Sequence, residues 1–104
     1  PVLAHYARPV ITHVVMWRFH DPADMDEAAA RLRSLPGRVS GITSLRVGPN
    51  QNRTEHAYQL VLVSEHADAD ALRAYIADPA HQEVAHWLSE RVAARAVVDT
   101  DDLR

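Results

Sequence analysis

The 104-residue sequence contains no cysteine and no lysine, and its three glycines are Gly37, Gly41 and Gly48. The absence of cysteine excludes thiolate nucleophiles, disulfides, iron–sulfur clusters and cysteine-ligated zinc. Without lysine, a Schiff-base nucleophile and covalently held pyridoxal phosphate are excluded as well. Glycines this sparse do not form a phosphate-binding loop or a G-x-G-x-x-G turn, and no G-x-S-x-G elbow occurs. Any catalysis must therefore use histidine, carboxylate or tyrosine side chains, or a bound cofactor.

Charge and hydropathy narrow the range of partners. The formal net charge is −3, and the sequence has no basic run and no interleaving of basic and aromatic residues. This pattern disfavours nucleic acid and anionic membranes as partners. The sequence shows no signal-peptide pattern and no bilayer-spanning apolar run, so we expect a cytoplasmic protein. The length suits one domain, which we place at residues 11–101, between a lead-in at 1–10 and a tail at 102–104.

Hydrophobic periodicity predicts alternating strands and helices. Strands are expected at residues 11–19, 41–50, 57–66 and 95–100, and helices at about 21–36, 68–77 and 80–92. The order β-α-β-β-α-α-β predicts an α+β, ferredoxin-like antiparallel sheet with its helices on one face. The other sheet face would then be too apolar for water, so we expect a homodimer. The residues expected on that face are Val14, Met16, Gln59, Val61 and Val63.

His81 stands in the first turn of a predicted helix, where carboxylates are the more usual residues. Asp78 is suited to the N-cap and Pro79 to the first helical position, which puts His81 at the third. It shares a helical face with Val84, Leu88 and Val92, so we expect the ring to point inward. Burial and the positive helix end both disfavour imidazolium, so the ring is expected to be neutral and able to accept a proton.

Two further polar side chains are predicted to face the core. His13 lies on the same strand face as Val15 and Trp17. Tyr75 is turned inward on the apolar face of the helix at 68–77, whose apolar positions also include Leu72 and Ile76. A structural explanation is available for each histidine. His81 could bond a backbone carbonyl, and the His13 ring could meet solvent at the start of its strand. On spacing alone, a functional cluster and these structural roles both stay open.

Metal binding is the rival use of the histidines, and we expect no metal site. His81 and His86 fall on different sides of a helix, and His13 and His20 fall on opposite faces of a strand. Neither pair has the chelating spacing of H-E-x-x-H. The remaining histidines are expected to be solvated in loops, namely His5, His56 and His66.

Several segments together resemble the stress-responsive dimeric α/β barrel family, often called Dabb. They are THVVMWRF, LPGRVSGITSLRVGPN, AYIADPAH and VVDTD, which occur in order between Ile11 and Asp101. The most specific element is a tyrosine followed by Pro-x-His, here Tyr75, Pro79 and His81, with Asp99 in the last strand. The resemblance implies a ferredoxin-like monomer that pairs through its sheet into a barrel-like homodimer.

The resemblance also implies an activity, because enzymatic relatives include plant polyketide cyclases similar to olivetolic acid cyclase. Those enzymes catalyse an intramolecular aldol condensation without a cofactor. Their Pro-x-His histidine is the base, the preceding tyrosine supports it and a first-strand histidine lines the pocket, which implies these roles for His81, Tyr75 and His13. The first helical region is shorter here, so the aromatic pocket residues of those cyclases have no clear counterpart.

The sequence therefore predicts a cofactor-independent acid–base enzyme, a polyketide cyclase or related lyase. Its partner would be a small apolar or aromatic molecule, a β-keto or phenolic intermediate. The cavity-lining residues are predicted to be Val15, Trp17, Val84 and Val92. Two alternatives remain: a non-catalytic dimeric stress or ligand-binding protein, and an oxygen-using relative of cofactor-free monooxygenases or haem-binding barrels.

Overall fold

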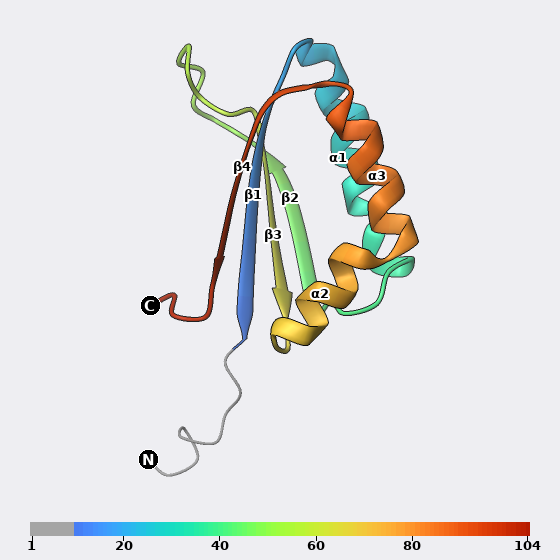
Figure 1. Cartoon of the computed structure of the whole chain (residues 1–104). Coiled ribbons are helices and arrows are strands. Elements are labelled where there is room, and N and C mark those ends of the chain that lie inside the picture. Colours follow the sequence, from blue (N-terminus) through green and yellow to red (C-terminus); the bar gives the residue numbers. More distant parts are fainter. Residues whose placement is uncertain (1–9) are drawn as a thin grey trace.

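The computed structural model describes residues 10–104, in which helices cover one face of a four-stranded sheet (Figure 1). The strands are β1 (Ile11–Phe19), β2 (Ser44–Pro49), β3 (Leu60–His66) and β4 (Val92–Thr100). The helices are α1 (Met25–Arg33), α2 (Ala69–Ala77) and α3 (Pro79–Ser89), with short 3-10 turns η2 (Pro22–Asp24) and η3 (Leu35–Gly37) flanking α1. His5, which was expected in a solvated loop, and residues 1–9 of the predicted lead-in lie outside the described residues.

The strand order is β2-β3-β1-β4, and each neighbouring pair is antiparallel. The ferredoxin-like fold predicted from the sequence is thereby confirmed. The register places residues of β4 directly beside those of β1: Asp99 is opposite His13, and Arg95 is opposite Trp17. Because directly opposed residues point to the same side of a sheet, these side chains share the helix-covered face.

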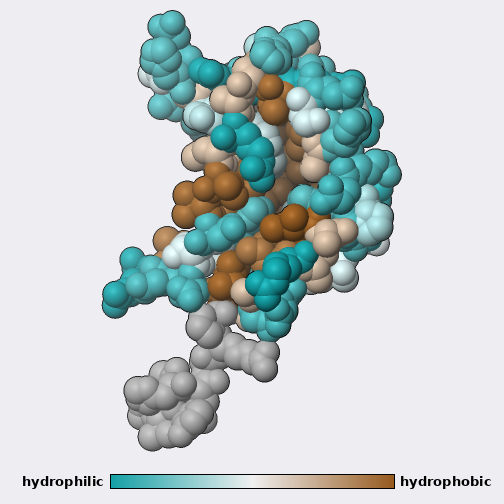
Figure 2. Space-filling view, viewed as in Figure 1, coloured by the Kyte–Doolittle hydropathy of each residue, from teal (hydrophilic) through white to brown (hydrophobic). Residues whose placement is uncertain are grey.

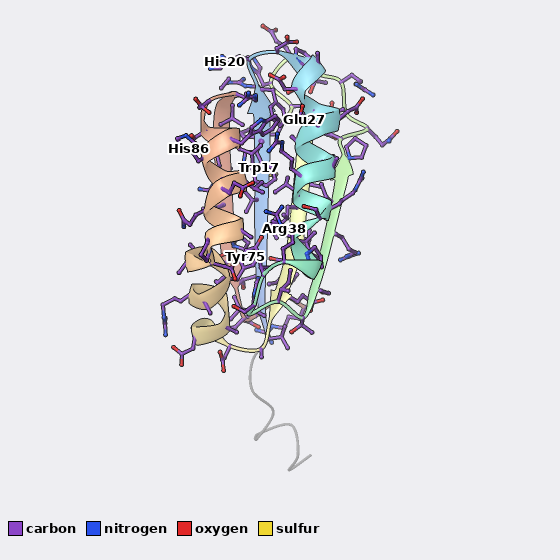
Figure 3. The ribbon with its side chains drawn as sticks, turned by 90° about the vertical axis from the view of Figure 1, so that its right-hand side faces the viewer. Trp17, His20, Glu27, Arg38, Tyr75 and His86 are labelled. Carbon is purple, nitrogen blue, oxygen red and sulfur yellow. The ribbon has the colours of Figure 1, made fainter. Side chains whose placement is uncertain are left out.

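The core lies between the sheet and the helices. Alternate residues of the strands point into the core from the sheet, and α1, α2 and α3 each pack an apolar face against it from the other side. The buried apolar members of the core include Val15, Trp17, Leu62, Leu32, Leu72, Val84 and Leu88. Figure 3 looks onto the helical layer and shows Trp17 and Tyr75 inside the molecule, with His86 on the outer surface of α3.

Some predicted element boundaries were wrong. The third helix ends at Ser89 instead of continuing to Val92, because the chain turns at Arg91 and Val92 begins β4. The predicted first helix is interrupted: only Met25–Arg33 is α-helical, and the proline-containing segments on either side form 3-10 turns. Ile76 belongs to the predicted apolar face of α2 but is 38% exposed, whereas Leu72 and Tyr75 of the same helix are buried.

The start of α3 confirms the predicted cap. The Asp78 carboxylate accepts a hydrogen bond from the Ala80 amide at 2.9 Å, and Pro79 occupies the first helical position. The same carboxylate accepts a bond from the Ser40 amide at 3.2 Å, which joins the junction between α2 and α3 to the loop before β2. Asp78 therefore fixes both the start of α3 and the position of His81 within its first turn.

Replacing Asp78 by alanine is expected to lower the melting temperature by about 5 °C, because α3 loses its cap. The amide hydrogen bonds from Ala80 and Ser40 lower the pKa of Asp78. Its contribution is therefore present above the ordinary aspartate pKa and is lost as the pH falls through the lowered value. The difference between wild type and D78A is expected to narrow in acid, which thermal unfolding at several pH values measures. Equal melting temperatures at neutral pH would contradict the cap.

The second sheet face carries no helix in the described part of the chain (Figure 1). Val14, Met16, Val61 and Val63 stand on it and are partly exposed, and Val98 of β4 is 57% exposed. This is the apolar face that the sequence predicts. None of the described helices is both long and apolar enough to cross a bilayer.

Candidate functional site

A cavity of about 220 Å³ lies between the sheet and the helices, lined mainly by β1, α3 and the start of β4. Figure 2 shows hydrophobic surface in the hollow between the strand side and the helix side of the molecule. The cavity brings together all seven side chains proposed from the sequence as catalytic or substrate-binding. They are His13, Val15, Trp17, Tyr75, His81, Val84 and Val92. Their position is thereby established, whereas their catalytic and binding roles stay predictions.

His81 reaches this cavity from the first turn of α3. The Nδ1 atom of its ring is buried and has no hydrogen-bond partner among the described residues. Burial lowers the pKa of His81, and electrostatic interaction with His13 and Arg95 lowers it further. The Ile76 carbonyl and the Asp78 carboxylate act in the opposite direction without reversing the shift. The ring is therefore neutral at neutral pH and can accept a proton.

Tyr75 lies between the histidines of the site. Its ring packs against the His81 ring with 4.6 Å between centroids, and against the His66 ring at 4.8 Å. The His13 ring approaches it edge-on at 6.0 Å. Burial raises the pKa of Tyr75 to about 12. The phenol therefore stays protonated, and it can donate a hydrogen bond to an oxygen atom of a ligand.

His13 is held by Asp99, across the β1–β4 pair. The Nδ1–H of His13 donates to the Asp99 carboxylate, and His13 is only 3% exposed. The solvent-facing structural role considered for this histidine is therefore wrong. A carboxylate on Nδ1 fixes the orientation of the imidazole and leaves Nε2 for another partner. The aspartate of the last strand thus orients a histidine of the first strand.

His66 was predicted to be a solvated loop residue, and this prediction was wrong, because His66 is fully buried at the end of β3. Its Nδ1 atom donates to the Gly41 carbonyl at 2.5 Å. Burial lowers the pKa of His66, so the ring is neutral and Nε2 accepts from the Ser64 hydroxyl at 2.8 Å. Period-two spacing from Leu60 could have found this pair, since it places Ser64 and His66 on the inner face.

Arg95 also lines the cavity and was missed at the sequence level. It lies on β4 opposite Trp17, and its side chain is exposed at the cavity mouth. The signal was again available in the strand alternation, because Arg95, Val97 and Asp99 share one face. Charged residues of an edge strand usually face solvent, so their position in the alternation alone does not place them in a cavity.

Metal ligation has no support in the geometry of residues 10–104. Within that range, no group of three histidine, aspartate or glutamate side chains is arranged to hold a metal ion. His86 projects away from the site with a side chain that is 79% exposed, so it does not pair with His81. The arrangement instead combines the neutral His81 imidazole with the protonated Tyr75 phenol in a mainly apolar cavity, which suits proton transfer to and from a bound molecule.

Comparisons with known proteins agree with this architecture. An uncharacterized protein of Streptomyces coelicolor is 31% identical over 84 residues, which are 75% of this chain and 87% of the relative. A dimeric protein of unknown function with a ferredoxin-like fold, from Bacteroides fragilis, is 25% identical with a TM-score of 0.79, covering 91% of this chain and 98% of that one.

The hydroxynitrile lyase of Passiflora edulis has the same fold. It superposes with a TM-score of 0.78 at 12% identity, over 89% of this chain and 93% of that one. At this identity the likeness shows a shared fold only. The family described as the stress responsive A/B barrel domain, Dabb, matches residues 11–102. The chain therefore belongs to the Dabb family.

Proposed function

We propose that this protein is a cofactor-independent acid–base enzyme, a polyketide cyclase or related lyase that acts on a β-keto or phenolic intermediate. The observation that carries the proposal is the state of His81. Its ring is neutral, its Nδ1 atom is buried without a partner in the described structure, and it faces Tyr75 in an apolar cavity. A buried polar atom without a partner is costly in a site that exists only for packing, and a bound ligand would relieve that cost.

The proposed reaction begins with proton transfer from carbon to His81. The neutral imidazole accepts the acidic C–H proton beside a carbonyl, which leaves an enolate. The Tyr75 hydroxyl donates a hydrogen bond to the enolate oxygen, and His13, oriented by Asp99, binds a second substrate oxygen. In a cyclisation, the enolate carbon attacks another carbonyl of the same molecule and the protonated His81 returns its proton to the resulting alkoxide. No net oxidation or reduction takes place.

The size of the cavity supports a small substrate. Ligand sites of drug-sized molecules usually measure about 300–1,000 Å³, whereas this cavity measures about 220 Å³. The cavity is large enough for a ligand with about one six-membered ring, and it is too small for a macrocycle such as haem. The volume therefore gives the haem-binding alternative less support. The Passiflora edulis lyase of the same fold indicates that the fold is compatible with lyase chemistry.

The test is carbon-acid exchange in deuterated water. We expect the wild-type protein to accelerate incorporation of deuterium at the acidic C–H of a small β-keto ester, ethyl acetoacetate, above the rate in matched buffer. NMR of the same samples reports the pKa of the His81 ring, which is expected below about 6.5. Binding of the ester without faster exchange would favour the non-catalytic ligand-binding alternative.

We further propose that the protein is a homodimer that pairs through its open sheet face. The partly exposed valines of β1 and β3 form a continuous apolar surface with Met16 on the side without helices. A self-complementary surface of this kind is the usual basis of a two-fold symmetric dimer. The B. fragilis protein, described as dimeric, shares the fold over almost the whole chain.

Glutamate at Met16 is expected to convert the dimer into a monomer and to raise its dissociation constant roughly 100-fold or more, because the carboxylate would be buried in an apolar interface. Light scattering of wild type and M16E at equal concentration measures the effect. Glutamate at Ala30, an exposed residue of α1, is the matched control and is expected to stay dimeric. A wild-type monomer would contradict the proposed pairing.

A further inference from the structure

Arg95 differs in charge from the rest of the cavity. The remaining lining residues within the described chain are apolar or uncharged polar side chains and the two histidines, of which His81 is neutral. Arg95 thus supplies the one permanent charge among these lining residues. No carboxylate lines the cavity in the described part of the molecule to neutralise it.

The surroundings of Arg95 leave its guanidinium available. Asp99 lies on the same face of β4, but its carboxylate is engaged by His13. Arg31 and Arg91 near α3 both stack on the Trp87 ring, at 4.4 and 4.1 Å from its centroid, and both are paired with glutamates. Arg95 makes no ion pair or side-chain hydrogen bond within residues 10–104. It is exposed, and a guanidinium carries a permanent charge.

We propose that the cavity takes a carboxylate-bearing ligand, whose apolar body lies beside His81 and Tyr75 and whose carboxylate pairs with Arg95 at the mouth. This inference rests on the proposed function and adds a substrate class to it. The planar guanidinium presents parallel N–H donors that match the two oxygens of a carboxylate. One arginine and no other permanent charge among the lining residues match a ligand with a single carboxylate.

The position of Arg95 also links ligand binding to the base. The Tyr75 ring of α2 contacts the His81 ring, and three groups from neighbouring elements act on it electrostatically: His13 of β1, Arg95 of β4 and the N-cap Asp78. Arg95 and His13 lower the pKa of His81, whereas Asp78 raises it. A carboxylate bound to Arg95 would offset the arginine charge, so the pKa of His81 would rise when the ligand binds. His81 would then be a stronger base when the substrate is in place than in the free protein.

The experiment uses two probes of the same shape, phenylacetate and 2-phenylacetamide, which differ in charge. We expect phenylacetate to bind wild type more tightly than the amide, and R95Q to bind phenylacetate at least about tenfold more weakly than wild type does. The amide affinity is expected to change less than about twofold. R95K is expected to retain part of the carboxylate affinity, because lysine keeps the positive charge but lacks the parallel N–H donors of the guanidinium. R73Q is the control, because Arg73 lies on α2, pairs with Asp70 and does not line the cavity.

NMR titration of the His81 ring provides the second measurement. The pKa of His81 is expected to rise in free R95Q and to rise in wild type saturated with phenylacetate. It is expected to be unaltered in R73Q. This readout does not depend on turnover.

Equal binding of phenylacetate by wild type and R95Q would overturn the carboxylate site, as would a failure of phenylacetate to bind wild type at all. An unaltered His81 pKa in R95Q would overturn the link to the base. Loss of the carboxylate site while wild type still accelerates carbon-acid exchange would leave the proposed enzyme function standing. Binding to Arg95 without any exchange activity would support this inference and contradict the enzyme.

Discussion

Replacing His81 by glutamine is expected to lower the rate of carbon-acid exchange by roughly 10²–10⁴-fold, the usual contribution of a positioned general base. Glutamine approximates the size of imidazole but cannot accept the substrate proton. The free energy of unfolding is expected to stay nearly unchanged or to rise, because the native site leaves Nδ1 of His81 buried without a partner in the described structure. Exchange followed by NMR, together with thermal unfolding of the same samples, measures both effects.

The matched control is His86→Gln, which changes a histidine on the exposed side of the same helix. It is expected to preserve both exchange and stability. An H81Q variant that exchanges deuterium as fast as wild type would remove His81 from the mechanism. An H81Q variant that unfolds much more easily, combined with a His81 ring titrating above about 6.5, would identify a structural, ion-paired histidine.

The lowered pKa of His81 predicts how the stability and the exchange rate of wild type and H81Q depend on pH. A histidine that is harder to protonate in the folded state destabilises the fold progressively as the pH falls below the unfolded-state value of about 6.5. H81Q lacks this penalty, so its stability relative to wild type is expected to increase in mild acid. Exchange by wild type is expected to persist below pH 6.5 and to fall only when the lowered pKa is reached. Thermal unfolding and exchange rates measured from pH 5 to 7.5 test both trends.

The sequence predicted the fold well because its signals are local and periodic. The β-branched run of β1 and the Asp78–Pro79 break between α2 and α3 each specify an element without information from elsewhere in the chain. The inward position of His81 follows from the same helix register. His13 and Tyr75 could be predicted for similar reasons, since one lies on a strand face with Trp17 and the other on a helical apolar stripe.

What the sequence could not supply is pairing between distant segments. The link from His13 to Asp99 depends on the β1–β4 register, and the link from His66 to Gly41 depends on a loop that passes beside β3. Arg95 lines the cavity because β4 lies beside β1 in the sheet, and this adjacency is set by the tertiary fold. Local patterns determine which face a residue occupies, whereas tertiary contacts determine which partners it meets there.

Gly41 is the position where we expect the largest loss of stability, because its backbone has a φ of +77° and lies against α2. A Cβ atom there would lie 2.2 Å from the Ala71 carbonyl oxygen and 3.0 Å from the Tyr75 amide nitrogen. Both are backbone atoms, so no side-chain rotation relieves the clash. Gly41→Ala is therefore expected to lower the free energy of unfolding by roughly 3–5 kcal/mol, combining a strained φ with displacement of a helix.

The same substitution is expected to disturb the site as well as the fold. The Gly41 carbonyl accepts the Nδ1–H of His66, and the displaced helix carries Tyr75, which packs against both His66 and His81. In any folded fraction of G41A, the pKa of His81 and the exchange rate are therefore expected to change together. Gly37→Ala is the matched control, because an added Cβ meets nothing within 4 Å and φ is not positive there. Denaturant unfolding that showed G41A to be as stable as G37A would mean that α2 can move away from Gly41 at little cost, and that the rigid placement of Tyr75 does not depend on this contact.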